Sequence, residues 1–239
     1  MRRDFVLVHG MSHGGWAWAS LAERLERAGH RVIAPDLPGH GRRAHERRRA
    51  SVHAYARAVA DAMILAGMTD AVVVGHSMGG VVIPKVAELV ESRVGHLVFL
   101  AAVVLPDGGS MLDVHLGPAT GALLRGLAAA GDGAVQYPAA LEWSRWLGDM
   151  PPGDERVVDA LGRMTPQPFR PVAERVSMRR FHAMRVPRTY IRCLRDAAVP
   201  PARAARYAAR LGVTPIDLDT AHNPMMSAPD RLAKILTSL

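Results

Sequence analysis

The chain has 239 residues, of which 49% are hydrophobic and 22% are charged, so its composition is that of a globular protein and excludes an intrinsically disordered chain. Its length suits one α/β domain with a modest insertion, large enough to bury a core without disulfide or metal support. The formal net charge of +8 comes mostly from arginine.

Five clustered arginines raise the question of a nucleic-acid partner: Arg42, Arg43, Arg47, Arg48 and Arg49. No aromatic residue is interleaved with them, and the run lies between a predicted strand and a predicted helix. A solvated loop is the simplest interpretation, and attraction of an anionic substrate is the alternative. We therefore expect no nucleic acid among the partners of this chain.

The single cysteine, Cys193, excludes an intramolecular disulfide and is typical of a reducing compartment. The first residues, MRRDFVLVHG, lack the apolar stretch and cleavage site of a signal peptide and indicate a first strand instead. The longest apolar runs, near residues 72–74 and 97–105, are too short to span a bilayer. We expect a cytoplasmic protein without a membrane partner.

Short apolar runs rich in β-branched residues alternate with amphipathic helical patterns, which predicts a parallel sheet with crossover helices. Strands are expected at residues 5–8, 31–34, 71–74, 96–100, 189–192 and 214–218. Helices are expected at residues 16–28, 52–66, 78–91, 202–211 and 229–236. Ser51 is a candidate N-cap for the second helix, and Gly29 and Gly67 are candidate C-terminal stops. The fold class is therefore α/β.

The alternation stops between residues 106 and 186, where the chain carries PDGG, MPPGD and TPQPFRP. A structureless loop of that length is implausible in a compact domain, so we predict a helical lid at 106–186 inserted into a core of 1–105 and 187–239. A largely apolar substrate pocket is expected between the lid and the sheet edge. Candidates to line it are Met111, Leu112, Trp143, Trp146, Met150 and Phe181.

The strand at residues 71–74 runs directly into GHSMGG and then a helix, which is the G-x-S-x-G pattern in the context that it requires. Ser77 is therefore the candidate nucleophile, held at a strained backbone position above the sheet. Side chains at Gly75 or Gly79 would clash with neighbouring backbone. The Met78 amide, near a helix N-terminus, is free to bind an oxyanion. The alternative is a glycine-rich turn with an incidental serine.

The loop after the first strand reads HGMSHGGW and is the expected source of a second oxyanion donor. Its glycines allow a close approach of the chain, and the Met11 amide is the candidate. His9 and His13 are interpreted as groups that hydrogen-bond this loop into shape, because no Cys or carboxylate stands at metal-ligand spacing. We expect neither a metal nor an organic cofactor.

In the fold that carries G-x-S-x-G between a strand and a helix, an acid and then a histidine follow the serine along the chain. His182 falls in the predicted lid, whereas His222 follows the strand at 214–218 on a short loop, so His222 is favoured as the base. Asp196 follows the strand at 189–192 and can hold the outer nitrogen of the imidazole. Asp107 is the competing acid, since it follows the strand at 96–100.

Segments along nearly the whole chain resemble the plant methylesterase and hydroxynitrile-lyase branch of the α/β-hydrolase superfamily and its bacterial relatives. They are FVLVHGMSHGGWAW, GHSMGG, FLAAVVLPDG, LGRMTPQPF, and YIRCLRDAAVPPA followed by AHNPMMSAPDRLA. The resemblance thins between residues 114 and 158. It implies the α/β-hydrolase fold, a mostly parallel sheet with a helical lid. By this resemblance Ser77, Asp196 and His222 match the family's catalytic triad, and Met11 and Met78 match its backbone oxyanion donors.

Two departures bear on the reaction that the resemblance implies. Lyases of this branch typically carry Thr at the position of Gly10 and Lys at that of Asn223. A lyase needs a cation to stabilise departing cyanide, which a neutral amide serves poorly. We therefore expect a serine hydrolase of small-molecule carboxylic esters that works through an acyl-enzyme on Ser77. Alternatives are a natural-product tailoring thioesterase, lactonase or cyclase, a hydroxynitrile lyase and a non-catalytic ligand receptor. A homodimer is left open.

Overall fold

Six strands form one sheet in the order β2-β1-β3-β4-β7-β8, and each neighbouring pair is parallel. The computed structural model describes residues 2–239. All predicted strands are present, so the α/β fold class is confirmed. β8 begins two residues later than expected, and β3 continues to His76, the residue before Ser77. The strands are β1 (Asp4–Val8), β2 (Arg31–Ile33), β3 (Ala71–His76), β4 (Val94–Leu100), β7 (Arg188–Cys193) and β8 (Ile216–Leu218).

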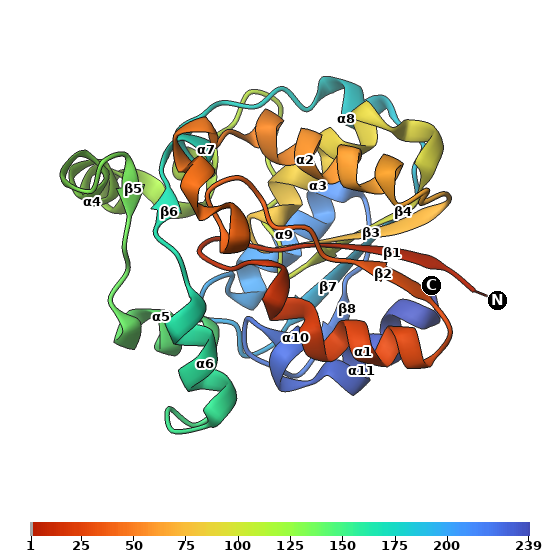
Figure 1. The fold of residues 1–239 in the computed structure, drawn as a ribbon. Helices are drawn as coiled ribbons and strands as arrows, with labels where there is room; N and C mark the ends of the chain where they lie inside the picture. Colours follow the sequence, from red (N-terminus) through yellow and green to blue (C-terminus); the bar gives the residue numbers. More distant parts are fainter. Residues whose placement is uncertain (1) are drawn as a thin grey trace.

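Helices cover both faces of the sheet because successive strand residues point to opposite faces, and β1, β3 and β4 carry apolar residues on both. Val6 and Val8 pack with helices α2 (Val52–Leu65), α3 (Gly79–Leu89) and α9 (Pro201–Leu211). Phe5 and Leu7 pack with α1 (Ala19–Arg27), α10 (Pro224–Ser227) and α11 (Pro229–Thr237). Figure 1 shows α2 and α3 above the sheet and α1 and α11 below it. Burial on both faces explains the continuous apolar runs in the sequence.

The predicted helix ends agree with the structure to within one or two residues, with one correction. The Ser51 hydroxyl accepts the backbone N–H of Ala54 at 3.0 Å, which confirms the predicted N-cap of α2. Gly29 and Gly67 follow their helices with φ of +87° and +60°, as helix-ending glycines do. The helix expected at residues 16–28 is instead a 3₁₀ turn (Gly15–Trp18) followed by α1.

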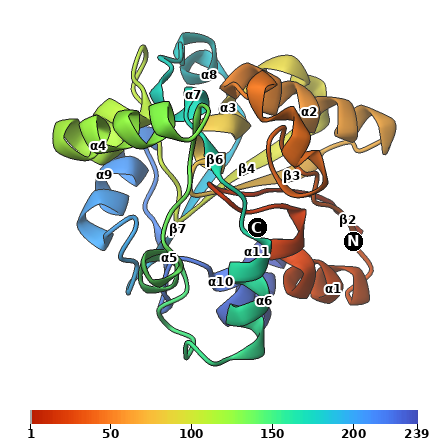
Figure 2. The ribbon, with the colours of Figure 1, turned by 60° about the vertical axis from the view of Figure 1, so that its left-hand side comes forward.

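Residues between β4 and β7 form a lid of helices, most of which lies beyond the carboxyl ends of the strands, while its last helix packs against α3 (Figures 1 and 2). Its elements are a π-helical turn (Leu112–Leu116), α4 (Gly117–Ala130), α5 (Ala139–Trp146), α6 (Glu155–Arg163), α7 (Arg170–Ala173) and α8 (Arg179–Ala183). The lid also contains an antiparallel pair, β5 (Ala134–Val135) and β6 (Gln167–Pro168). Two-residue strands are too short to leave a periodic pattern, so the sequence did not predict this pair.

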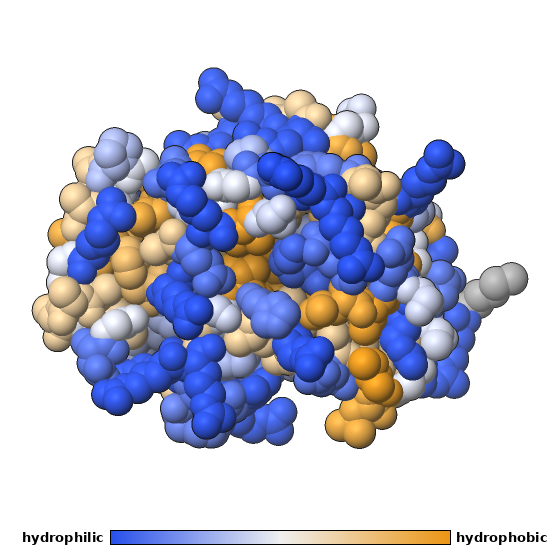
Figure 3. Space-filling view, turned by 90° about the horizontal axis from the view of Figure 1, so that it is seen from above, coloured by the Kyte–Doolittle hydropathy of each residue, from blue (hydrophilic) through white to orange (hydrophobic). Residues whose placement is uncertain are grey.

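The arginine cluster lies on a 3₁₀ segment (Gly41–Arg49) that has no buried residue. Arg47 reaches the lid, where its Nη2 lies 2.6 Å from the Asp132 carboxylate, and Arg43 pairs with Glu46 at 2.7 Å. These contacts favour the solvated interpretation of the cluster. Figure 3, seen from the side of α2 and α8, shows mostly hydrophilic residues with smaller hydrophobic areas between them. Within residues 2–239, no helix combines the length and the apolarity that crossing a membrane requires.

Candidate active site

β3 leads directly into Ser77, whose backbone has a φ of +54°, the left-handed region that non-glycine residues rarely adopt. The neighbouring glycines are required by close packing. A Cβ on Gly75 would lie 2.6 Å from the carbonyl oxygen of Gly79, and one on Gly79 would lie 2.7 Å from that of Val8. The Ser77 amide donates to the Leu100 carbonyl at 3.1 Å, so the sheet itself holds the turn. The serine therefore sits on the sharp, strained turn that the sequence predicts.

His222 and Asp196, 26 residues apart in the sequence, form a buried hydrogen bond between Nδ1 and Oδ2 at 2.7 Å. Oδ1 of Asp196 accepts the backbone N–H groups of Ala198 and Val199 at 2.7 and 2.8 Å. The His222 carbonyl accepts a hydrogen bond from His76 Nε2 at 3.0 Å. These contacts orient the imidazole and leave its Nε2 as the ring nitrogen available for proton transfer.

The two groups that compete with this pair lie elsewhere. The Asp107 carboxylate accepts the backbone N–H of Met178 at 2.8 Å and pairs with Arg179 at 2.9 Å. The hydrogen bond from Arg179 is the main cause that lowers the pKa of Asp107 to about 2. His182 lies on α8 with its side chain exposed. Neither residue lines the cavity that Ser77 and His222 share.

The loop after β1 is shaped by its own histidines. His9 donates through Nδ1 to the Gly10 carbonyl at 2.9 Å and accepts the Leu37 N–H at its Nε2 at 3.0 Å. His13 donates through Nδ1 to the Met11 carbonyl at 2.6 Å. Burial lowers the pKa of both rings, to about 4 for His13, so both are neutral near pH 7.

The backbone N–H groups of Met11 and Met78 donate to no other group in the part of the chain that the structure describes. Both residues are buried, and Met11 lines the same cavity as Ser77. Gly10 lies against the nucleophile, because a Cβ there would be 2.8 Å from the Ser77 Cβ. The two amides are therefore free to receive an oxyanion, and the loop tolerates only glycine at position 10.

Asn223, the residue after His222, ties two loops together. Its side chain is fully buried, and its Nδ2 donates to Nε2 of His13 at 2.8 Å. The amide thus completes the hydrogen bonds of the His13 ring. It supplies no positive charge next to His222.

Gln167, in the TPQP segment, is a residue whose role sequence reasoning missed. Its Oε1 accepts the Ser12 N–H and a hydrogen bond from His40 Nε2, both at 3.1 Å. Its Nε2 donates to the Pro168 carbonyl at 2.8 Å and lies 3.8 Å from Met78 Sδ. One buried amide thereby joins the lid to both loops that carry the free N–H groups. The only signal in the sequence was its place in LGRMTPQPF, one of the segments that carry the family resemblance.

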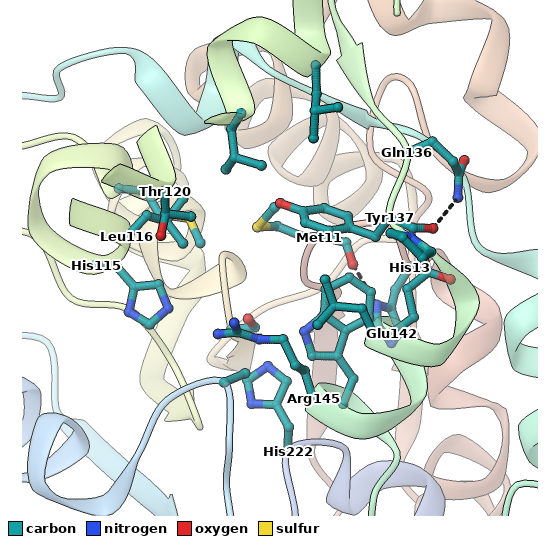
Figure 4. Close-up of a pocket in the computed structure, with 18 of the residues that line it drawn as sticks. Met11, His13, His115, Leu116, Thr120, Gln136, Tyr137, Glu142, Arg145 and His222 are labelled. Atoms are coloured by element: carbon teal, nitrogen blue, oxygen red, sulfur yellow. Dashed lines mark hydrogen bonds between the residues drawn. The ribbon is translucent and has the colours of Figure 1, made fainter. Parts of the chain in front are cut away.

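A cavity of about 410 Å³ lies between the lid and the sheet edge, and Ser77 and His222 both line it. Of the predicted pocket residues, Met111 and Trp146 line it. Figure 4 shows the cavity with other residues of its wall, among them His115 and Glu142. The full lining is Met11, His13, His76, Ser77, Met111, His115, Leu116, Thr120, Leu123, Leu124, Leu127, Gln136, Tyr137, Pro138, Leu141, Glu142, Arg145, Trp146, Ala198 and His222.

The structure places the other four predicted pocket residues outside the cavity wall. Leu112 packs against Gly121, where a Cβ, if present, would lie 3.3 Å from the Leu112 Cδ1. Trp143 donates through its indole N–H to the Met150 carbonyl at 3.0 Å. Phe181 packs in the core on the face of the sheet that α2 and α3 cover. An apolar pattern predicts burial but cannot tell the cavity side of a buried segment from its other sides.

Two titratable lid side chains that sequence reasoning did not single out also line the cavity. His115, on the π-helical turn, lies with Nδ1 3.1 Å from the Tyr207 hydroxyl, and burial lowers the pKa of its ring to about 3. Glu142, on α5, is 3% exposed, and burial raises the pKa of its carboxyl to about 7. Together with Thr120, Gln136, Tyr137 and Arg145, these two side chains place polar groups in a mainly apolar wall.

Comparison with known proteins gives a family and several relatives. The model of a family described as the alpha/beta hydrolase family matches residues 5–235. A carbendazim hydrolyzing esterase of Nocardioides sp. (strain SG-4G) is 39% identical over 110 residues, 46% of each chain. The putative chloroplastic methylesterase 11 of Arabidopsis thaliana is 33% identical over 207 residues, 82% of this chain and 53% of that protein. The chain therefore spans about half the length of these curated relatives.

Among solved structures, an extracellular alpha/beta-hydrolase from a Paenibacillus species superposes with a TM-score of 0.89 at 24% identity. The match covers 99% of this chain and 98% of that one. The fold is therefore shared along the whole chain, lid included.

Proposed function

The chain belongs to the alpha/beta hydrolase family, and from that premise we propose that it is a serine esterase that cleaves small carboxylic esters. The family match confirms the resemblance that the sequence motifs indicate. The observation that carries the proposal is the buried 2.7 Å hydrogen bond between His222 and Asp196, beside a cavity that Ser77 also lines. The relatives named esterase and methylesterase support the same reaction.

In the proposed acylation step, Oγ of Ser77 attacks the ester carbonyl while Nε2 of His222 accepts the hydroxyl proton. Asp196 stabilises the imidazolium that forms. The N–H groups of Met11 and Met78 donate to the oxyanion, where charge develops in the transition state. Collapse of the tetrahedral intermediate breaks the ester bond, and His222 returns its proton to the departing alcohol.

Deacylation repeats the cycle with water as the nucleophile. His222 accepts a proton from the water as its oxygen attacks the acyl carbonyl, and the same two N–H groups hold the second oxyanion. The Ser77 oxygen then leaves, regains the proton from His222 and releases the carboxylic acid. Every step uses groups of this chain, the ester and water.

The surroundings of His222 favour hydrolysis over cyanohydrin cleavage. Asn223 is neutral and its amide is engaged with His13 at 2.8 Å, so position 223 supplies no cation to receive cyanide. A side chain at position 10 would collide with Ser77. Both observations support the ester hydrolase over the lyase.

A panel of nitrophenyl and methyl esters, tested on the wild type and on Ser77→Ala, checks the proposal. We expect the variant to lose at least ~10³-fold in kcat while its circular dichroism stays native, as deletions of a nucleophile do. A fluorophosphonate probe should label the wild type only. Ester hydrolysis retained by Ser77→Ala would refute the mechanism, and release of cyanide from cyanohydrins would favour the lyase.

The predicted cytoplasmic location stays a prediction, supported by Cys193, which is a buried free thiol. The small-molecule ester is the partner that we propose. A homodimer stays an open prediction.

A further inference from the structure

The lid side of the cavity is formed mainly by aliphatic side chains. Leu123, Leu124 and Leu127 of α4, and Leu141 of α5, line it. Such a wall binds hydrocarbon through the hydrophobic effect but gives little control over orientation. In an apolar pocket, the few polar groups decide which substrate fits and which way round it lies.

Glu142 is a polar group of this wall without a partner. It lines the cavity from α5, on the side opposite His115 in Figure 4, and is 3% exposed. Its Oε1 is fully enclosed, and neither carboxyl oxygen accepts a hydrogen bond from any group of residues 2–239. A buried acceptor without a donor is costly. Of the carboxyl groups in residues 2–239 that have a buried, unpaired oxygen, Glu142 is the one that lines this cavity.

The charged and titratable side chains near Glu142 do not supply the missing donor. Arg145 follows on the same helix and lines the cavity, but it is exposed, and no ion pair joins it to Glu142 in the described structure. His13 and His115 share the cavity, yet burial lowers their pKa values to about 4 and 3, so neither is a cation near pH 7. No group of residues 2–239 donates to this carboxyl, so a molecule that enters the cavity can supply the donor.

We propose that Glu142 is the recognition site for a nitrogen donor of the substrate, so that the preferred ester carries a protonated amine on the part that fills the lid cavity. An ammonium group supplies N–H donors, and its positive charge pairs with the negative charge of an ionised carboxylate. The aliphatic wall then binds the chain between the amine and the ester. This inference rests on the proposed esterase function for its kinetic test.

The ionisation of Glu142 fits this role. Burial raises the pKa of the carboxyl to about 7, so near neutral pH the empty site holds both the acid and the carboxylate. A bound ammonium favours the carboxylate, because opposite charges attract strongly in an environment of low dielectric. A hydrocarbon in its place would leave the acceptor unpaired.

Three nitrophenyl esters of similar length test the inference at pH 8: the 6-aminohexanoate, the heptanoate and the adipate monoester. We expect kcat/KM of the wild type to be highest for the amine. The kcat/KM for the 6-aminohexanoate ester, divided by that for the heptanoate ester, should fall by about 10- to 100-fold in Glu142→Gln and in Glu142→Leu. Loss of a hydrogen bond to a charged group implies a change of this size. Glu155→Gln, the same change at an exposed lid position, is the matched control and should keep the ratio.

Two outcomes would overturn the inference: a ratio that neither Glu142 variant changes, or a preference for the adipate ester, which would assign recognition to Arg145 instead. Calorimetric binding of hexylammonium and of hexan-1-ol separates this inference from the catalytic one. If the protein hydrolyses no ester, hexylammonium should still bind the wild type more tightly than Glu142→Gln. Equal binding to both proteins would refute the site whatever the fate of the esterase proposal.

Discussion

Two buried carboxyls, Asp196 of the core and Glu142 of the lid, are nearly equally exposed, at 4% and 3%, but have opposite surroundings. Asp196 accepts three hydrogen bonds, two from backbone N–H groups and one from His222. Glu142 accepts none within residues 2–239. Hydrogen bonds at both oxygens hold Asp196 in one geometry, whereas Glu142 leaves an acceptor for a molecule that enters the cavity. The comparison separates the carboxyl that we propose for catalysis from the carboxyl that we propose for substrate selection.

The largest effect is expected from replacing the core carboxyl, Asp196. Asp196→Asn keeps the size of the side chain but reverses one hydrogen bond to the imidazole, which favours the wrong tautomer of His222. We expect kcat to fall by about 10⁴-fold, as the equivalent change does in serine proteases. Steady-state kinetics on a nitrophenyl ester measure it. A loss no greater than that of Glu142→Gln on the uncharged heptanoate would show that the two carboxyls do not differ in role.

An intermediate effect is expected at Gln167, where core and lid meet. Gln167→Leu removes an acceptor for the Ser12 N–H and the His40 ring, so the loop that carries the Met11 amide loses a fixed position. We expect kcat to fall by ~10- to 100-fold with little change in KM, because the proposed oxyanion donors act mainly in the transition state.

Binding of a boronic acid, which mimics the tetrahedral intermediate, should weaken by a similar factor in Gln167→Leu. A substrate-like alcohol should bind as before. If KM rises and kcat does not change, Gln167 holds the lid closed and does not position the oxyanion loop.

The smallest effect concerns stability and sharpens the lid side. Because burial raises the pKa of Glu142 to about 7 from its usual 4.5, the folded protein holds this proton more tightly than the unfolded chain does. The free energy of unfolding of the wild type should therefore fall as the pH rises from 4.5 to 7, and level off above 7. Glu142→Gln has no carboxyl to titrate, so its free energy of unfolding should not fall in this way. Between pH 4.5 and 7 it should rise by about 2 kcal/mol relative to that of the wild type.

Urea unfolding of the wild type, Glu142→Gln and Glu155→Gln at pH values between 4.5 and 8 measures this difference. The Glu155 variant should stay parallel to the wild type, because its side chain is exposed. A constant offset between Glu142→Gln and the wild type would mean that the carboxyl ionises as it does in water.

Local patterns were enough to predict the elements that carry the site. Runs of apolar residues predicted the six strands, and the glycines around Ser77 predicted its strained turn, because both depend on residues close in sequence. His222 and Asp196 were predicted from their positions just after strands. Parallel strands bring their carboxyl ends to one edge, and there the structure joins the two side chains at 2.7 Å.

Only the tertiary structure decided which lid residues face the cavity. Leu112, Trp143, Met150 and Phe181 have the apolar character expected of a pocket wall, yet they pack elsewhere, while the charged Glu142 faces the cavity. A sequence indicates whether a residue is buried, but not whether it is buried against the cavity or against other side chains.

The sequence by itself determined the α/β fold, the strained turn at Ser77 and the order of the residues that we propose for catalysis, because these follow from periodicity and from local backbone needs. The tertiary structure alone decided which polar groups have partners. Gln167 meets the Ser12 N–H across 155 residues of chain, and Glu142 meets no donor at all among residues 2–239. Hydrogen bonds between distant segments depend on how the lid packs on the core, and no local pattern records that packing.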